Sequence, residues 1–148
     1  MSSMAATQRN SGPAVLLYGF RPMFLAAASW AIIALVLWLG MFFGIVQLPT
    51  RFDPMSWHVH EMLFGFVMAA VAGFLLTAIP NWTGRLPVRG TRLAVLAGLW
   101  LLGRLACLIS ANMPAWLAII ADLAFPTALL TVATRHGAQL AKPARDAS

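Results

Sequence analysis

Four long apolar stretches alternate with short polar segments along this chain. The first covers residues 23–46, which is 24 residues without a charge, and roughly 20 apolar residues are enough to cross the hydrocarbon core of a bilayer. Three further spans are expected at about residues 57–80, 93–111 and 115–134. Only a three-residue turn separates the last two, so they should form a tight antiparallel hairpin.

This pattern predicts an all-α fold, a polytopic membrane protein whose four transmembrane helices form one bundle over residues 23–134. The first apolar stretch is longer than the about 7–15 residues of a signal peptide, so we expect it to remain as an anchor. Composition supports this class, because 61% of the residues are hydrophobic and 9% are charged, against about 25% charged in soluble domains. A soluble enzyme, a disordered tail and a disulfide-rich secreted module are thereby excluded.

Positive charges predict the orientation of the bundle. The net charge is +6, and Arg51 is the single basic residue expected on one side of the spans. Because cytoplasmic loops carry the excess of Lys and Arg, residues 1–22 and 135–148 are expected to form a cytoplasmic N-terminal segment and tail. The charges lie in short loops and not on one solvated face, so we expect the lipid bilayer and not nucleic acid as partner. The basic residues on the expected cytoplasmic side are Arg9, Arg21, Arg85, Arg89, Arg92, Arg135, Lys142 and Arg145.

Two prolines predict interruptions of these helices. Proline lacks the backbone N–H of a helix interior, and its ring clashes with the preceding turn. We therefore expect the second helix to stop near Pro80 and the fourth to kink at Pro126, which lies inside its span.

Small residues predict a flat stripe on the second span. Gly65, Ala69 and Gly73 recur every four residues, and such stripes allow a neighbouring helix to approach closely. The plane of a porphyrin fits the same surface. The simplest partner is the Gly40-x-x-x-Gly44 face of the first span.

The segment Trp57-His58-Val59-His60-Glu61-Met62 carries most of the candidate chemistry. It places two imidazoles and a carboxylate at the outer mouth of an otherwise apolar span, where ionisable groups are functional candidates. Neutral imidazole binds copper, iron and zinc and serves as an axial ligand of haem, and a Met thioether suits Cu(I) or a haem axial position. His58, His60 and Glu61 are therefore candidate metal ligands, and Met62 is a candidate cofactor ligand.

Helical geometry limits how these residues act together. His58 shares a face with Glu61 and Met62, whereas His60 lies about 200° round from His58. If both histidines are helical, they cannot bind the same ion, and each serves a different metal or haem centre. The alternative is that the chain is not yet helical at the entry to the span, where both could bind one metal. Glu61 is placed to orient His58 through its other ring nitrogen. The structural alternative is that the histidines cap the helix start near anionic headgroups, with Glu61 favoured by the positive end of the helix dipole.

Arg104 and Asp122 are symmetric about Met113 in the tight turn, so an antiparallel hairpin puts them at one depth. Each lies about nine residues from the turn, which is roughly 10–14 Å down the helix, where an unpaired charge is costly. One interpretation is a structural ion pair that locks the third and fourth spans. The other is that Arg104 binds a haem propionate or another anion while Asp122 balances it or relays protons. The two roles are compatible.

Cys107 is the single cysteine and lies inside an apolar run. One thiol forms neither an internal disulfide nor a cysteine cluster, so we expect Cys107 to be a small core residue. The sequence also contains no phosphate-binding loop and no nucleophile with an arranged base. We therefore expect no enzymatic activity.

Four motifs occur in order along the chain. They are GFRP at 19–22, WHVHEMLFGF at 57–66, AGFLLTAIPNWTG at 72–84 and WLLGR at 100–104. Together they resemble the N-terminal part of the NnrS family, and the likeness runs from about residue 19 to at least residue 122.

The resemblance implies a protein of the bacterial inner membrane that binds haem and copper and helps cells tolerate nitric oxide and nitrosative stress, often encoded near denitrification functions. Nitric oxide is then a candidate ligand. The matching WHVHEM motif puts His58 and His60 forward as ligands, with Glu61 and Met62 as support. Members of the family are not established enzymes.

Length separates this chain from the family, whose members usually have more than the four spans expected here. We expect either a truncated or split member, or a chain that completes its site as a homo-oligomer or with a partner that supplies the missing spans. Two other functions stay open. One is a cofactor-free structural or assembly fragment of a larger membrane complex, and the other is a small quinone-linked cytochrome subunit.

Overall fold

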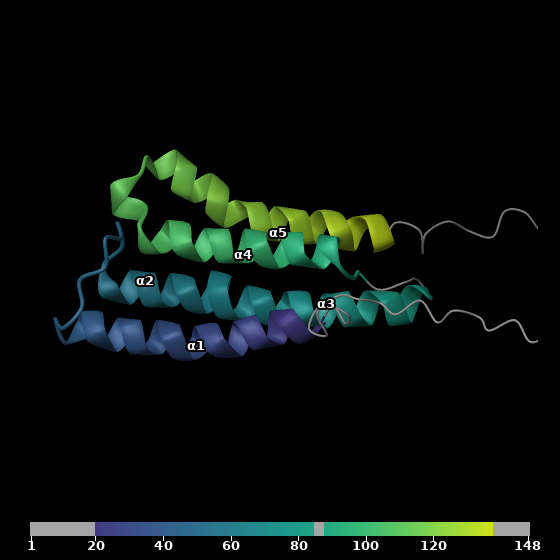
Figure 1. Cartoon of the computed structure of the whole chain (residues 1–148), viewed down its shortest axis with the longest axis horizontal. Helices are drawn as coiled ribbons and strands as arrows, with labels where there is room; N and C mark the ends of the chain where they lie inside the picture. Colours follow the sequence, from purple (N-terminus) through teal and green to yellow (C-terminus); the bar gives the residue numbers. More distant parts are fainter. Residues whose placement is uncertain (1–19, 85–87, 138–148) are drawn as a thin grey trace, which may run out of the picture.

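The computed structural model describes residues 20–84 and 88–137, and helices account for almost all of them. No strand occurs within these two segments. Four helices are long and apolar enough to cross a membrane, and they lie side by side in alternating directions (Figure 1). The chain is therefore an all-α, multi-pass membrane protein, as the sequence predicted.

Each span is either one helix or a continuous run of helical segments. The first span is α1, Phe20–Phe42. The second joins α2 at Pro54–His60, the π-helix η2 at Glu61–Val67 and α3 at Met68–Thr83. The third and fourth are α4, Thr91–Leu108, and α5, Ala115–Gly137, with the short 3-10 turn η3 at Ser110–Asn112 between them.

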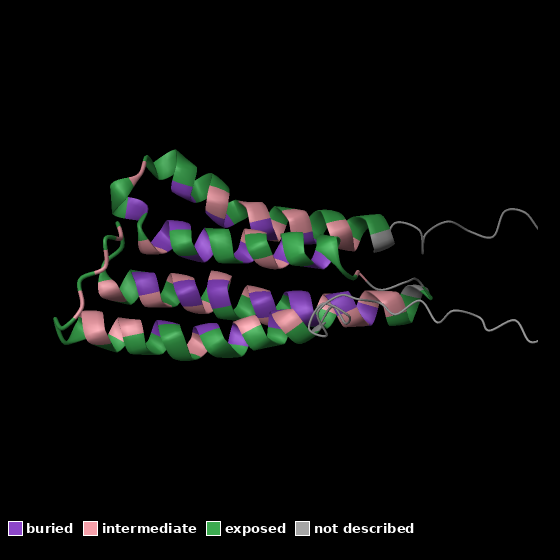
Figure 2. Ribbon diagram, viewed as in Figure 1, coloured by how far each residue is buried: buried purple, intermediate pink, exposed green. Residues whose placement is uncertain are grey.

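The second span holds the bundle together. α1 packs along α2, η2 and α3, α4 pairs with α5, and this hairpin contacts the second span through α3 and η2. Figure 2 shows buried residues facing neighbouring helices and wide exposed faces outside. Leucine, isoleucine, valine and phenylalanine dominate the exposed large hydrophobic residues. Such a surface suits lipid tails, which are as apolar as leucine.

The first helix is shorter than expected at its C-terminal end. α1 stops at Phe42 because Gly44 turns the chain with φ 71°. The backbone N–H groups of Ile45 and Val46 return to the carbonyl of Gly40, at 2.8 and 3.0 Å. An ideal Cβ on Gly40 would come within 2.9 Å of Val46 Cγ2. The expected contact between the Gly40/Gly44 face and the second span is therefore wrong, since Gly40 packs against its own turn.

The expected helix stop at Pro80 is also wrong. The second span continues through this residue to Thr83 and ends at Gly84, whose φ of 65° suits a left-handed C-terminal cap. Membrane helices tolerate proline because neighbouring groups satisfy the freed carbonyl. α5 likewise runs unbroken through Pro126, and Figure 1 shows its N-terminal part inclined to the rest of the helix, consistent with the expected kink.

The small-residue stripe of the second span faces α1. An ideal Cβ on Gly65 would lie 2.3 Å from Trp30 Nε1, and one on Gly73 would lie 3.1 Å from the ring of Phe24. Aromatic side chains of α1 therefore fill the hollows that glycine leaves. The stripe is a helix-packing surface, and the porphyrin alternative does not hold at this face.

Candidate functional site

The π-helix η2 sets which residues of the second span face the bundle interior. Trp57, Glu61, Gly65 and Ala69 are all buried, although they are spaced four residues apart. In an α-helix each step of four overshoots a full turn by about 40°, which accumulates to about 120° over three steps. The wider turns of a π-helix remove that drift. Glu61 is thereby kept on the interior face.

The second span begins at Pro54, three residues earlier than the sequence indicated, and Asp53 is its N-cap. Its Oδ1 accepts hydrogen bonds of 3.1 Å from the backbone N–H groups of Met55 and Ser56, and Pro54 occupies the first turn. Hydrogen bonds from the Ser56 side chain and backbone lower the pKa of the Asp53 carboxyl below its ordinary value of 3.8. This cap gives residues 57–60 helical geometry, so the non-helical entry that would let both histidines bind one metal is absent from the described chain.

Four ionisable side chains form a closed ring among three spans. Arg104 Nη1 donates to Glu61 Oε2 at 2.9 Å, and Arg104 Nη2 donates to Asp122 Oδ1. The other oxygen of Asp122 lies 3.1 Å from Nε2 of His60. The ring closes where Nδ1 of His60 lies 3.2 Å from Glu61 Oε1.

This ring satisfies charges that are expensive inside a membrane. Glu61 is fully buried and Arg104 is 2% exposed. With both nitrogens of His60 carrying a proton, two positive groups face two negative ones. Both Nη atoms of Arg104 are engaged by carboxylates, which favours the ion-pair interpretation over contact with a propionate. The ring connects the second, third and fourth spans electrostatically.

Gly103 allows α4 and α5 to approach at this level. An ideal Cβ at Gly103 would lie 3.2 Å from Asp122 Cα and 3.3 Å from the carbonyl oxygen of Ala121. Both contacts involve backbone, which cannot rotate away. Gly103 thus sets the separation at which Arg104 reaches Asp122.

Two tryptophans that the sequence analysis missed frame the ring. Trp30 Nε1 donates to Glu61 Oε2 at 2.8 Å, and Trp100 Nε1 donates to the carbonyl of Gly65 at 2.9 Å. Their rings meet edge to face with centroids 5.8 Å apart. The sequence gives only a weak signal for them: a buried tryptophan usually finds an acceptor for its indole N–H, but the buried indole nitrogens of Trp38 and Trp57 have none among the described residues.

His58 lies in a different environment from His60. Its ring stacks on Trp38 of α1, with centroids 4.4 Å apart and 23° between planes. Its Nδ1 atom is buried and has no hydrogen-bond partner among the described residues. The expected contact between Glu61 and His58 does not form: the ring of His58 stacks on Trp38, and the carboxylate of Glu61 is engaged by Trp30, Arg104 and His60.

His60 is held between two aromatic rings. Phe52 and Phe64 stack on it with centroid distances of 5.2 and 4.7 Å. Together with both ring-nitrogen contacts, this stacking fixes the imidazole plane.

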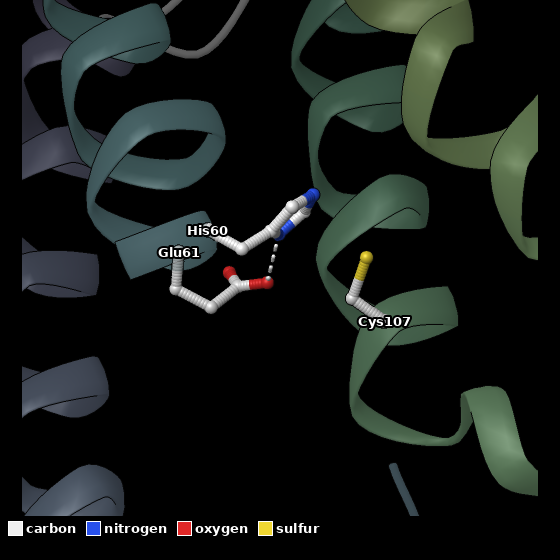
Figure 3. Close-up of side chains that lie close together, drawn as sticks. All are labelled: His60, Glu61 and Cys107. Carbon is white, nitrogen blue, oxygen red and sulfur yellow. Dashed lines mark hydrogen bonds and ion pairs between the residues drawn. The ribbon is translucent and has the colours of Figure 1, made fainter. Parts of the chain in front are cut away.

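A three-residue group of possible metal ligands surrounds His60. One ligand atom from each of His60, Glu61 and Cys107 lies within 4.8 Å of the others, and Figure 3 shows Cys107 reaching toward the pair from α4. Cys107 is buried as expected of a core residue, yet its role beside the histidine was missed. Met62 is half-buried and packs against the hydrophobic core.

Arg51 fastens the loop beside the site to the α4–α5 turn. Its Nε donates to the Ser110 carbonyl and its Nη2 to the Met113 carbonyl, both at 2.8 Å, while its backbone N–H donates to Ser110 Oγ at 3.0 Å. These carbonyls follow the end of α4, where intrahelical partners run out. Arg51 is therefore a structural clamp between this loop and the α4–α5 turn.

A family model described as NnrS protein matches residues 14–146, which is most of the chain. No match was found among curated proteins or among solved structures.

Proposed function

Because this chain belongs to the NnrS family, we propose that it is a haem- and copper-binding protein of the bacterial inner membrane that helps the cell tolerate nitric oxide. In this proposal the helix bundle is a binding protein and not an enzyme. The bound metal supplies a coordination position for nitric oxide. The protein supplies the ligands and an apolar surrounding.

The observation that carries the proposal is the orphaned nitrogen of His58. A buried polar atom without a partner is costly, and almost all such atoms in proteins find one. The Nδ1 atom of His58 is buried in that state, on a ring that Trp38 holds by stacking. The three other such side-chain atoms among the described residues are indole and guanidinium nitrogens, so His58 Nδ1 alone of the four is a possible metal ligand. We assign His58 as the ligand of the haem iron, because a neutral imidazole with an unused nitrogen suits that role.

Copper is assigned to the group of His60, Glu61 and Cys107. Imidazole and thiolate are ligands that copper prefers, and these three side chains come close enough to share one ion. Binding requires His60 to exchange one of its two carboxylate contacts for the metal. Glu61 or Asp122 would then keep the remaining nitrogen oriented, as outer partners of ligating histidines commonly do.

Metal analysis of the purified chain tests these assignments separately. We expect His58→Ala to lose iron and to retain copper. Cys107→Ser is expected to lose copper and to retain iron. His136→Ala, which removes the third histidine of the sequence, is the matched control and should keep both. Full iron content in His58→Ala would overturn the haem assignment, and full copper content in Cys107→Ser would overturn the copper assignment.

A cofactor-free assembly module is the second candidate function. It is favoured by the ring of Glu61, Arg104, Asp122 and His60, in which each member has a partner without any metal. This function predicts a folded chain that contains neither iron nor copper. The same metal analysis therefore decides between the two candidates.

A further inference from the structure

A groove opens between α4 and α5 near the end of the bundle that is opposite to Arg51. Its volume is about 540 Å³, within the range of about 300–1,000 Å³ that is usual for small-molecule sites. Apolar side chains form most of its walls, among them Val95 and Leu99 of α4 and Ala128 of α5. Arg92, in the first turn of α4, and Arg135, in the last turns of α5, also line it.

Within the described residues, the positive charge of this groove has no acidic counterpart. Both Arg92 and Arg135 are exposed. Of the three carboxylates in residues 20–84 and 88–137, Asp53 caps α2 at the opposite end of the bundle, and Glu61 and Asp122 are engaged in the ring around Arg104. The described part of the chain therefore offers no acidic side chain at this end. A negative group that pairs with Arg92 and Arg135 must therefore come from outside the described residues.

The start of α4 adds to this preference. Gly90 occupies the N-cap position and has no side chain with which to accept from the first helical N–H groups. The N-terminus of a helix carries partial positive charge and favours anions. Thr91, the first residue of the helix, lines the groove with its hydroxyl-bearing side chain. Polar groups gather at the helix ends, and the walls deeper in the span are apolar.

We propose that this groove binds one anionic phospholipid from the leaflet that meets the basic end of the bundle. An acyl chain lies along the apolar walls, and the phosphate is held by Arg92 and Arg135. Basic pockets between membrane helices recognise lipid headgroups in this way. The inference is independent of the cofactors, since none of these residues belongs to the ring or to the metal-ligand group.

Native mass spectrometry of the whole chain tests the proposal. The chain is released from detergent after incubation with phosphatidylglycerol or phosphatidylcholine of identical acyl chains. We expect retention of phosphatidylglycerol to exceed that of phosphatidylcholine by about tenfold or more, because two arginines contribute. R92Q/R135Q should remove this preference. R21Q/R89Q deletes the same charge outside the groove lining and should keep it.

A second variant distinguishes binding of the lipid inside the groove from a general attraction of anionic lipid to a positively charged surface. Ala128→Leu fills the groove and leaves both arginines in place, so it should lower retention of phosphatidylglycerol to that of R92Q/R135Q. Unchanged preference in R92Q/R135Q, or an equal loss in R21Q/R89Q, would overturn the proposal. Wild-type retention in Ala128→Leu would overturn it as well, and so would a stable dimer that retains no lipid.

Discussion

Trp30 of α1 donates a hydrogen bond of 2.8 Å from its indole nitrogen to the buried carboxylate of Glu61. The same oxygen of Glu61 accepts from Arg104, which also donates to Asp122. All four spans are therefore linked through one carboxylate. α1 joins the polar ring through a neutral donor, and the other three spans contribute the charges.

Trp30→Phe should destabilise the bundle without emptying this part of its core. Phenylalanine keeps an aromatic ring but removes the donor to Glu61, and hydrogen bonds to charged groups contribute about 1.5–3 kcal/mol. The free energy of unfolding, measured in mixed micelles with increasing denaturing detergent, is expected to fall by that amount. Trp116→Phe is the control, since Trp116 is 62% exposed. Equal effects of the two variants would contradict this role.

Arg104→Gln should cost more stability than Asp122→Asn. Replacing Arg104 leaves both Glu61 and Asp122 without their strongest partner, whereas Asp122→Asn leaves the pair of Arg104 and Glu61 intact. Breaking a buried ion pair by removing one partner costs about 3–5 kcal/mol. In a double-mutant cycle, the double variant should lose less than the sum of the single losses. Additive losses would show that the two side chains do not interact.

The spans and the depth of the polar residues could be predicted from the sequence. The length of an apolar stretch is enough to identify a membrane span. The short turn places Arg104 and Asp122 at equal distances from it, independently of how the other spans pack. The ends of the helices were harder to predict from the sequence. The chain beyond Phe42 stays apolar while Gly44 turns it, and Pro80 sits in a helix whose actual cap is Gly84.

Gly103→Ala should destabilise the α4–α5 hairpin, whereas Gly98→Ala should not. A methyl group at Gly103 meets the backbone of α5 at 3.2 Å, but no atom lies within 4 Å of the corresponding position at Gly98. Overpacking typically costs about 1–3 kcal/mol, while Gly→Ala at an open helix position is favourable by about 1 kcal/mol. The same unfolding assay compares the two. Equal stabilisation by both variants would refute close packing at Gly103.

Asp53 should make the second span less stable at acidic pH. Its pKa is lowered in the folded protein, so its contribution is present above the ordinary value of 3.8 and is lost as the pH falls through the lower, folded-state value. Asp53→Asn keeps an acceptor oxygen but has no charge to lose. The difference in melting temperature between wild type and Asp53→Asn should therefore shrink below about pH 4. A difference that stays constant from pH 6 to that range would contradict the charged cap.

Ser56→Ala provides a second check on this cap. It removes a side-chain hydrogen bond that contributes most to lowering the pKa of Asp53. The acid transition attributed to Asp53 should then move toward higher pH. An unchanged transition would show that Ser56 does not act on the carboxylate.

The pairing of the site residues could be predicted only in part. The separation of His58 from His60 around the helix follows from helical periodicity, but the partner of Glu61 does not. The π-helix keeps Glu61 on the interior face, and its sequence signal is the run of Trp57, Glu61, Gly65 and Ala69 at steps of four. Contacts with Trp30 and Cys107 depend on how separate spans dock, which local periodicity does not determine.

The most direct test of the central claim, that His58 holds haem, is an absorption spectrum of the detergent-purified chain in oxidised and reduced forms, recorded for wild type, His58→Ala and His136→Ala. We predict a Soret band with stoichiometric iron in wild type and in His136→Ala, and its loss in a folded His58→Ala chain. A Soret band of full intensity in His58→Ala would contradict the assignment. A folded wild-type chain without colour or iron would contradict haem binding altogether.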